Sequence, residues 1–136
     1  MTLKNLVRIR QLNPEPPDRR EFESLVKAAV DRLKDSTNES LHFTSRFDLA
    51  YGAAHGLALA ALRASGHRSD KRYLVFQCLS HTTELSKSHI RLFSLCHEKR
   101  NLAAYEGHLE TDEQLLSELI SGVEELLKLV DEIELI

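Results

Sequence analysis

The segment LHFTSRFDLAYGAAHGLALAALRASG, residues 41–66, decides the fold of this chain. Apolar side chains occupy nearly every side of a helix drawn through it, which is typical of a helix buried at the centre of a bundle. Gly66 supplies a C-terminal stop, so the sequence predicts a central helix over about 41–65. Gly52 and Gly56 lie one turn apart, and such small residues are expected where a neighbouring helix approaches closely.

Helical patterns also flank this segment on both sides. Asp18 and Glu21 have the form of a capping box, as do Thr111 and Gln114, and Asp70 can cap a helix that begins at the next residue. The sequence shows no alternating strand pattern. It therefore predicts an all-α, up-and-down bundle of about five helices. Their expected ranges are 18–35, 41–65, 71–83, from Ser86 or Ser88 to 106, and 112–135.

The residues before the bundle have a different character. The run N-P-E-P-P at 13–17 is incompatible with regular helix because proline lacks the backbone N–H and restricts the residue before it. We expect residues 1–17 to form an N-terminal arm and Pro-rich hinge, and residues 18–136 to form a single helical-bundle domain.

Composition limits the possible environments and partners. The chain is 42% hydrophobic and 29% charged, as is ordinary for a soluble globular protein, and no apolar run reaches membrane-spanning length. The N-terminus lacks a signal-peptide pattern, and Cys78 and Cys96 sit singly in apolar helical patterns, so we expect a cytoplasmic protein with free buried thiols.

The charge is uneven along the chain. The net charge of −3 conceals an acidic segment, 110–136, in which Lys128 is the one Lys or Arg, so the preceding part of the chain is mildly basic. That excess suits a phosphate-bearing ligand but is too small for a dedicated duplex-DNA binder. Solvated helix faces would explain it equally well.

The segment EKRNLAAYEG, residues 98–107, concentrates polar chemistry at the end of the fourth predicted helix. A rotation of about 100° per residue predicts one core face and one opposite, mixed stripe, which is either a partner surface or a solvated face. The predicted core face holds Leu92, Leu95, Cys96, Leu102 and Ala103. The opposite stripe holds Ile90, Ser94, His97, Asn101 and Tyr105.

A second polar group interrupts the apolar central helix. Asp48, Tyr51 and His55 share one face at positions i, i+3 and i+7. A buried carboxylate needs a partner, so we expect Asp48 to pair with Arg46, Arg100 or another arginine. The simplest interpretation of His55 is a hydrogen-bonded core histidine.

Two segments carry a family resemblance: Arg46–Tyr51, and Lys99–Gly107 with Arg100, Asn101 and Tyr105. The second resembles the R-N-x-x-x-H signature of the HEPN superfamily of small helical bundles, and together they resemble a bacterial branch whose motif reads R-N-x-x-x-Y. The resemblance implies a homodimer that brings two motifs to a shared cleft. In the ribonuclease members, which cut RNA without metal, Arg100 would hold the scissile phosphate, Asn101 would bond a ribose or phosphate oxygen, and Tyr105 would occupy the place of the catalytic histidine.

Tyrosine at that place changes the expected chemistry. Its ordinary pKa of about 10 makes Tyr105 a better hydrogen-bond donor or stacking surface than a base at neutral pH, whereas histidine titrates near neutrality. His97, one turn before Asn101, and His108 could substitute as bases. The histidines show no zinc-binding spacing, and we expect no metal or cofactor.

Two functions follow as hypotheses. The preferred one is a HEPN-like dimer that binds a nucleotide or RNA phosphate, or partners a nucleotidyltransferase of toxin–antitoxin type, without efficient catalysis. The alternative is a metal-independent endoribonuclease using Arg100, Asn101 and Tyr105. The expected ligand-binding residues are His97, Lys99, Arg100 and Asn101, supported by Arg46, Asp48, Tyr51 and His55.

Overall fold

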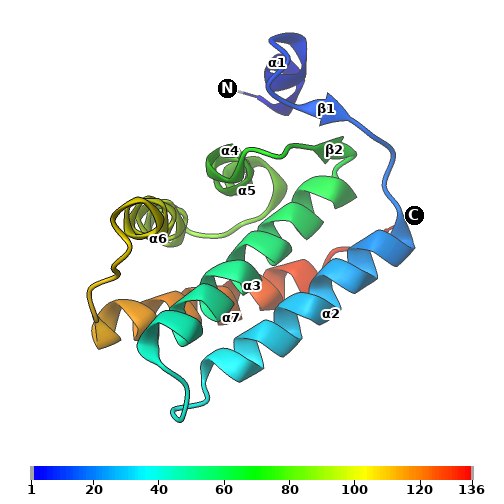
Figure 1. The fold of residues 1–136 in the computed structure, drawn as a ribbon. Helices are drawn as coiled ribbons and strands as arrows, with labels where there is room; N and C mark the ends of the chain where they lie inside the picture. Colours follow the sequence, from blue (N-terminus) through cyan, green and yellow to red (C-terminus); the bar gives the residue numbers. More distant parts are fainter. Residues whose placement is uncertain (1, 136) are drawn as a thin grey trace.

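In the computed structural model, which describes residues 2–135, the chain is a helical bundle with one minimal two-stranded pairing (Figure 1). The all-helical prediction is confirmed. Four of the expected helices correspond to α2, α3, α6 and α7, and the expected helix over 71–83 is divided into α4 and α5. Met1 and Ile136, the ends of the expected arm and bundle, lie outside the described residues. The elements are α1 (Leu3–Arg8), β1 (Asn13–Pro14), α2 (Arg19–Ser36), α3 (Phe43–Ala64), β2 (His67–Arg68), α4 (Arg72–Gln77), α5 (Leu79–Thr82), α6 (Lys87–Glu106) and α7 (Glu113–Asp131).

Helix α3 is the centre of the bundle, as its apolar sequence predicts. It packs most extensively on α2 and α7, and it also contacts α4, α5 and α6. The two glycines face α2: a Cβ on Gly52 would lie 3.3 Å from Cδ of Arg32, and one on Gly56 would lie 3.7 Å from Cβ of Ala29. The small residues therefore permit the close helix approach that the sequence predicted.

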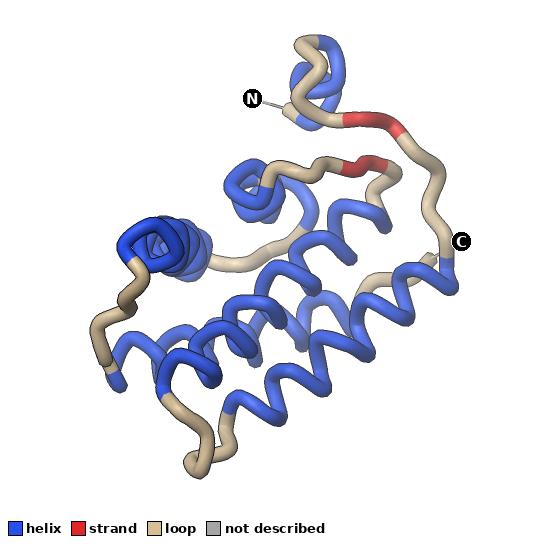
Figure 2. The backbone as a smooth tube through the Cα atoms, in the orientation of Figure 1, coloured by secondary structure: helices blue, strands red, loops and turns tan. Residues whose placement is uncertain are grey.

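The helices do not all share one direction. α2, α3 and α7 lie alongside one another, whereas α6 is seen nearly end-on in the same view and so runs across them (Figures 1 and 2). α4 and α5 lie between α6 and the end of α3. This arrangement brings the N-terminal half of α3, the start of α4 and the C-terminal half of α6 toward one another.

The helix starts show which side chains act as caps. Asp18 caps α2 by accepting from the N–H of Glu21, and Ser86 caps α6 by accepting from the N–H of His89. Two expected caps are wrong. Asp112 caps α7 in place of Thr111. Asp70 does not cap α4, whose N-cap residue is Lys71 and which has no side-chain cap hydrogen bond.

The N-terminal arm is fastened to the bundle by a buried arginine. Arg63 is only 2% exposed and donates hydrogen bonds to the carbonyl oxygens of Glu15, Pro16 and His67 and to the carboxylate of Glu21. β1 pairs antiparallel with β2 beside this contact, and Leu12 is buried. The chain before α2 therefore contributes to the core.

The expected core face of α6 is wrong in part. Cys96 is buried and Leu92 packs against the core as expected, but Leu95 and Leu102 are exposed, and Ile90 and Phe93 are buried instead. Phe93 decides the rotation because its ring packs 5.7 Å from that of Phe76, and because Gly122 on α7 leaves room for it. His97 lies one turn further along the same face, so part of the expected outer stripe faces α3.

Two further properties concern the helices as a set. Among the described residues, no helix is both long and apolar enough to cross a membrane. Cys78 and Cys96 are free and buried, as predicted. Burial raises the pKa of the Cys78 thiol to about 11 and that of Cys96 to about 12, so both thiols are protonated at neutral pH.

Candidate functional site

A hydrogen bond between two helices lies at the centre of the candidate site. The hydroxyl of Tyr51 on α3 is 2.8 Å from Nδ1 of His97 on α6, and the amide nitrogen of Asn101 donates to Nε2 of the same ring over 3.1 Å. With this amide orientation, Nδ1 carries the proton and donates to the Tyr51 oxygen. The two bonds fix both the tautomer and the direction of the His97 ring.

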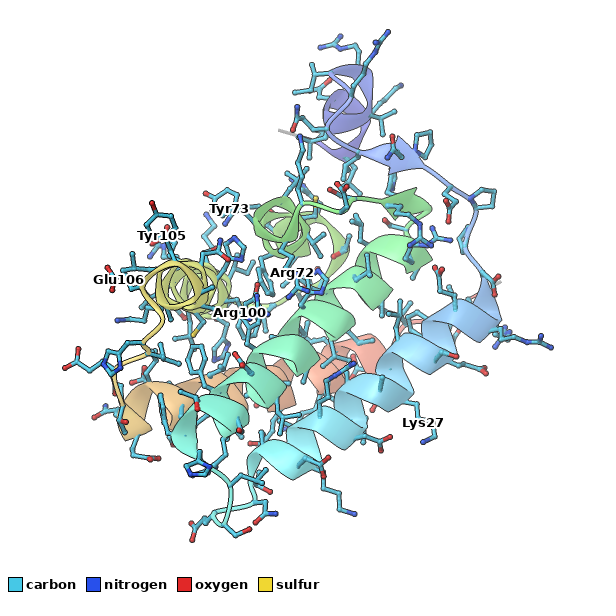
Figure 3. The ribbon with its side chains drawn as sticks, viewed as in Figure 1. Lys27, Arg72, Tyr73, Arg100, Tyr105 and Glu106 are labelled. Atoms are coloured by element: carbon cyan, nitrogen blue, oxygen red, sulfur yellow. The ribbon has the colours of Figure 1, made fainter. Side chains whose placement is uncertain are left out.

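Two arginines lie against the ring of Tyr51. Cζ of Arg100 is 5.0 Å from the ring centroid, and Cζ of Arg72 is 5.7 Å from it, so both guanidinium groups are within cation–π range of one buried aromatic. Arg72 belongs to the first turn of α4 and Arg100 to the last turns of α6 (Figure 3). We refer to Tyr51, Arg72, His97, Arg100 and Asn101 as the Tyr51 cluster.

The positive charge of the two arginines contributes to lowering the pKa of His97 and of the nearby His55. Burial, reinforced by Arg72 and Arg100, lowers the pKa of His97. Burial, followed by Arg72, His97 and Arg100, lowers the pKa of the nearby His55 to about 4. Both imidazoles are therefore neutral at pH 7, and the arginines carry the positive charge.

Little negative charge balances these arginines. Oδ1 of Asp48 lies 3.6 Å from Nε of Arg100, and among residues 2–135 no carboxylate is within ion-pair distance of Arg72. The pairing of Asp48 with an arginine is confirmed, but its expected burial is wrong, because its side chain is 62% exposed. Asp48 lies on the side of α3 that opens beside the end of α6 rather than on a packed face.

Three of the expected site residues lie apart from the cluster. Tyr105 is 92% exposed and projects from the outer side of α6 (Figure 3). Lys99 is also exposed. Arg46 has a different role: its Nε donates to the Ser36 carbonyl oxygen over 2.8 Å, and its terminal nitrogen is 3.7 Å from the Glu113 carboxylate. It fastens the end of α2 and the start of α7 to α3.

The sequence interpretation missed Arg72 and the neighbouring Tyr73, whose ring centroid is 6.4 Å from that of His97. The available signal was a cationic and aromatic pair at the start of a predicted helix. Nothing in the sequence indicated that this helix start would lie beside the end of α6, because that proximity depends on the crossing of α6 over α3.

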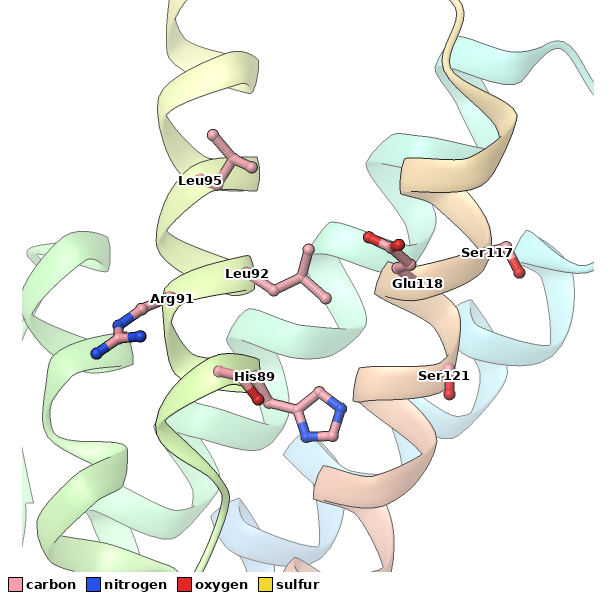
Figure 4. Close-up of a pocket in the computed structure, with 8 residues that line it drawn as sticks. His89, Arg91, Leu92, Leu95, Ser117, Glu118 and Ser121 are labelled. Carbon is pink, nitrogen blue, oxygen red and sulfur yellow. The ribbon is translucent and has the colours of Figure 1, made fainter.

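Several hollows border α6, and two of them bear on the choice of site. One of about 350 Å³ adjoins the cluster at Asp48 and Arg100, and its floor is largely apolar. A larger one of about 590 Å³ lies between α6 and α7, beside Leu92 and Leu95 (Figure 4). The paired guanidinium groups and the hydrogen-bonded imidazole lie at the Tyr51 cluster and not at the larger hollow, so the cluster is the candidate site.

Within residues 2–135, no group of three or more histidine, cysteine or acidic side chains is arranged to hold a metal ion. No family model matches the chain, and neither the curated proteins nor the solved structures provide a match. The chemistry of the site is therefore defined by its own side chains: two guanidinium groups, a neutral imidazole, a phenol and an amide. This donor-rich set is suited to an anion with several oxygen acceptors.

Proposed function

We propose that this protein binds a phosphate group of a nucleotide or RNA at the Tyr51 cluster. The observation that carries the proposal is the placement of Arg72 and Arg100 against one tyrosine ring, where Asp48, itself mostly exposed, is the one carboxylate among residues 2–135 within ion-pair distance of either arginine. Guanidinium groups bind phosphate through paired, charge-assisted hydrogen bonds. The cation–π contacts position both groups while their N–H donors remain available to a ligand.

The neutral histidine makes the proposed site responsive to its ligand. A phosphate beside His97 would oppose the effects of Arg72 and Arg100 that lower the His97 pKa. Protonated His97 would then add a further charged donor to the phosphate. Asn101 is exposed and can exchange its bond with His97 for one with a ligand oxygen.

A second candidate function, metal-independent cleavage of RNA, is favoured by one observation. His97 is neutral at pH 7, lies beside Arg100 and is oriented by Tyr51 and Asn101, as a general base must be. This version of the endoribonuclease hypothesis assigns the proton transfer to His97 rather than Tyr105. Arg100 would hold the phosphate whose bond breaks, and Asn101 would orient the ribose.

Homodimerisation remains part of the proposal, with a changed interface. Ile90 belonged to the interface expected from the sequence but is buried within the chain. Leu95 and Leu102 are exposed on α6 and provide apolar area for a second copy. A two-fold interface along this helix would pair the Leu95 and Leu102 faces of two copies, and it would leave Arg100 and Asn101, which lie on other sides of the helix, open to a ligand.

Phosphate binding is tested by titrating a fluorescein-labelled RNA oligonucleotide and following its anisotropy at low and moderate salt. Arg72→Ala and Arg100→Ala should each weaken binding about 10- to 150-fold, since charge-assisted hydrogen bonds contribute roughly 1.5–3 kcal/mol. Arg91→Ala is the matched control, because Arg91 is an exposed arginine on the same helix, beside the larger hollow. Equal losses in all three variants would show that binding depends only on net charge and would refute a site at the cluster.

A further inference from the structure

The first half of α4, which carries Arg72, has few attachments of its own. The helix is six residues long and has no side-chain cap, and its buried residues, Val75 and Phe76, lie in its second half. A helix this short is not stable alone in water, because it forms too few hydrogen bonds to offset the cost of its first turn. The position of Arg72 therefore depends on contacts that reach the start of α4 from elsewhere in the chain.

The N-terminal arm supplies contacts to the residues just before Arg72. Asn13 of β1 pairs with Arg68 of β2, so the arm holds the segment that leads into α4. Closer to the site, Nζ of Lys71 donates to Oε1 of Gln11 over 2.8 Å, and Lys71 is the N-cap residue of α4. Figure 1 shows the arm lying beside β2 and the start of α4. The arm thus bonds to the residue next to Arg72.

The arm is itself attached to the bundle, so it can transmit a fixed position to α4. Leu12, the neighbour of Gln11, is 1% exposed and belongs to the core. Arg63 holds the backbone of the arm a few residues further on. Among residues 2–135, no hydrogen bond or ion pair joins the arm to the Tyr51 cluster directly. The arm therefore reaches the cluster through Lys71.

We propose that the N-terminal arm positions Arg72 for its ligand, with Gln11 acting through its bond to Lys71 and Leu12 through its place in the core. This inference rests on the proposed phosphate site and adds control of that site by a segment outside it. When the arm is docked, the start of α4 is held and Arg72 stays beside Arg100. When the arm is released, Arg100 alone keeps its position. Because coupling between sites is reciprocal, a ligand that uses Arg72 also holds the arm on the bundle.

The test measures binding of the fluorescein-labelled RNA oligonucleotide by anisotropy in double-mutant cycles. Gln11→Ala should weaken binding about 2- to 10-fold, the range for loss of one hydrogen bond, and Leu12→Ala should weaken it at least as much. Neither substitution should weaken binding further in an Arg72→Ala protein, because the residue that they position is absent. In an Arg100→Ala protein, both should have their full effect.

Gln114→Ala is the matched control for Gln11→Ala. Gln114 is an exposed glutamine that donates a hydrogen bond to the Glu118 side chain on α7, away from the cluster, so its loss should leave affinity unchanged. Circular dichroism of each variant at the assay temperature should show the helical content of the wild type. Gln11→Ala leaves the core intact, and it therefore tests the proposal even if Leu12→Ala does not fold.

Trypsin provides the reciprocal measurement, because Arg8 and Arg10 are exposed in the arm. Saturating oligonucleotide should slow tryptic cleavage of the arm in the wild-type protein by about the same 2- to 10-fold factor. It should not slow cleavage in the Arg72→Ala protein. Slowing that persists without Arg72 would show that the oligonucleotide covers the arm directly, and it would refute the proposal.

The binding assay also separates failure of the arm from failure of the phosphate site. If both arm variants bind as tightly as the wild type while Arg72→Ala binds weakly, the phosphate site stands and the role of the arm is refuted. Equal losses from Gln11→Ala with and without Arg72 would also refute that role, since they would indicate an effect that does not pass through Arg72. If Arg72→Ala binds as Arg91→Ala does, the phosphate site itself fails.

Discussion

The hydroxyl of Tyr51 lies 2.8 Å from Nδ1 of His97, so one hydrogen bond joins the central helix to the helix that carries Arg100. The same Tyr51 ring lies against both Arg72 and Arg100. One residue of the buried helix therefore positions the imidazole through its oxygen and the guanidinium groups through its ring. These two roles can be separated by substitution.

Tyr51→Phe removes the oxygen and keeps the ring. We expect the free energy of unfolding to fall by about 1 kcal/mol, the usual contribution of one hydrogen bond, while binding of RNA phosphate is retained. Urea denaturation measures the first effect, and the His97 ring signals in NMR report its lost orientation. Tyr73→Phe, at an exposed position, should leave stability unchanged. A Tyr51→Phe protein as stable as the wild type would contradict a stabilising role for the bond.

Asp48→Ala should have opposite effects on stability and binding. The ion pair with Arg100 is largely exposed, so its loss should cost less than about 1 kcal/mol rather than the roughly 3 kcal/mol expected for a buried pair. Removing the carboxylate should strengthen RNA binding, because it repels phosphate and occupies Arg100. Thermal denaturation and anisotropy measure the two effects.

Asp31→Ala provides the comparison for Asp48→Ala, since Asp31 is in an exposed ion pair with Lys27 on α2. Asp31→Ala should lower the free energy of unfolding about as little as Asp48→Ala does, and it should leave RNA affinity unaltered. Weaker RNA binding by Asp48→Ala would mean that the carboxylate contacts the ligand or orients Arg100 for it.

The elements of this fold could be predicted because they depend on local chemistry. The apolar run of α3, the Asp18 cap and the Gly107 stop, whose φ is 76°, lie within single segments of the sequence. The rotation of α6 could not be predicted this way. Leucines at Leu95 and Leu102 indicated one face, whereas the contact of Phe93 with Phe76 and the space at Gly122 place another face inward.

The candidate site was only partly predictable for the same reason. Arg100 and Asn101 were identified from a local motif, but whether Tyr105 faces a partner residue depends on how α6 lies on α3. The inward turn of His97 placed it against Tyr51 and left Tyr105 in solvent. Arg72 joins the site through the packing of α4, which its neighbours in sequence do not specify.

Arg63→Met should destabilise the fold more than Tyr51→Phe or Asp48→Ala does. The buried guanidinium holds the Glu21 carboxylate and the carbonyl oxygens of Glu15, Pro16 and His67. Hydrogen bonds from charged groups typically contribute roughly 1.5–3 kcal/mol each, so loss of the three carbonyl contacts should be costly even though Glu21 keeps its ion pair with Arg68. Urea denaturation should show this loss, and limited proteolysis should show earlier cleavage of the arm.

The control for Arg63→Met is Arg68→Met, because Arg68 pairs with the same two glutamates but is much more exposed. Arg68→Met should lower the free energy of unfolding much less than Arg63→Met does. Equal costs would indicate that the glutamate pairs stabilise the arm and that the carbonyl contacts of Arg63 contribute little.

Stability should fall as pH decreases from 6.5 toward 4. The unfolded chain protonates His55 near pH 6.5, whereas burial, with Arg72, His97 and Arg100, lowers its folded pKa to about 4. The stability from this group is therefore complete above pH 6.5 and declines as pH falls, by up to about 3 kcal/mol. His55→Gln should reduce the slope of unfolding free energy against pH in urea titrations between pH 7 and 5. An unchanged slope would show that His55 is not responsible. The slope that remains after His55→Gln is assigned to His97, whose pKa is also lowered.

The final prediction separates binding from cleavage through His97 and Tyr105. If the protein is an endoribonuclease, single-stranded RNA should be cut in EDTA to products ending in cyclic phosphate, and Arg100→Ala should abolish the cutting, which excludes a contaminating nuclease. His97→Gln should then lower the rate about 10²- to 10⁴-fold with binding retained, as for loss of a general base. Tyr105→Phe should keep the rate, because its exposed hydroxyl lies outside the cluster. Since the pKa of His97 is lowered by burial and by Arg72 and Arg100, the wild-type rate should persist to lower pH than for an ordinary histidine base. Cleavage abolished by Tyr105→Phe would instead identify the tyrosine as the proton-transfer group, and RNA binding without cleavage by the wild type would identify a binding protein.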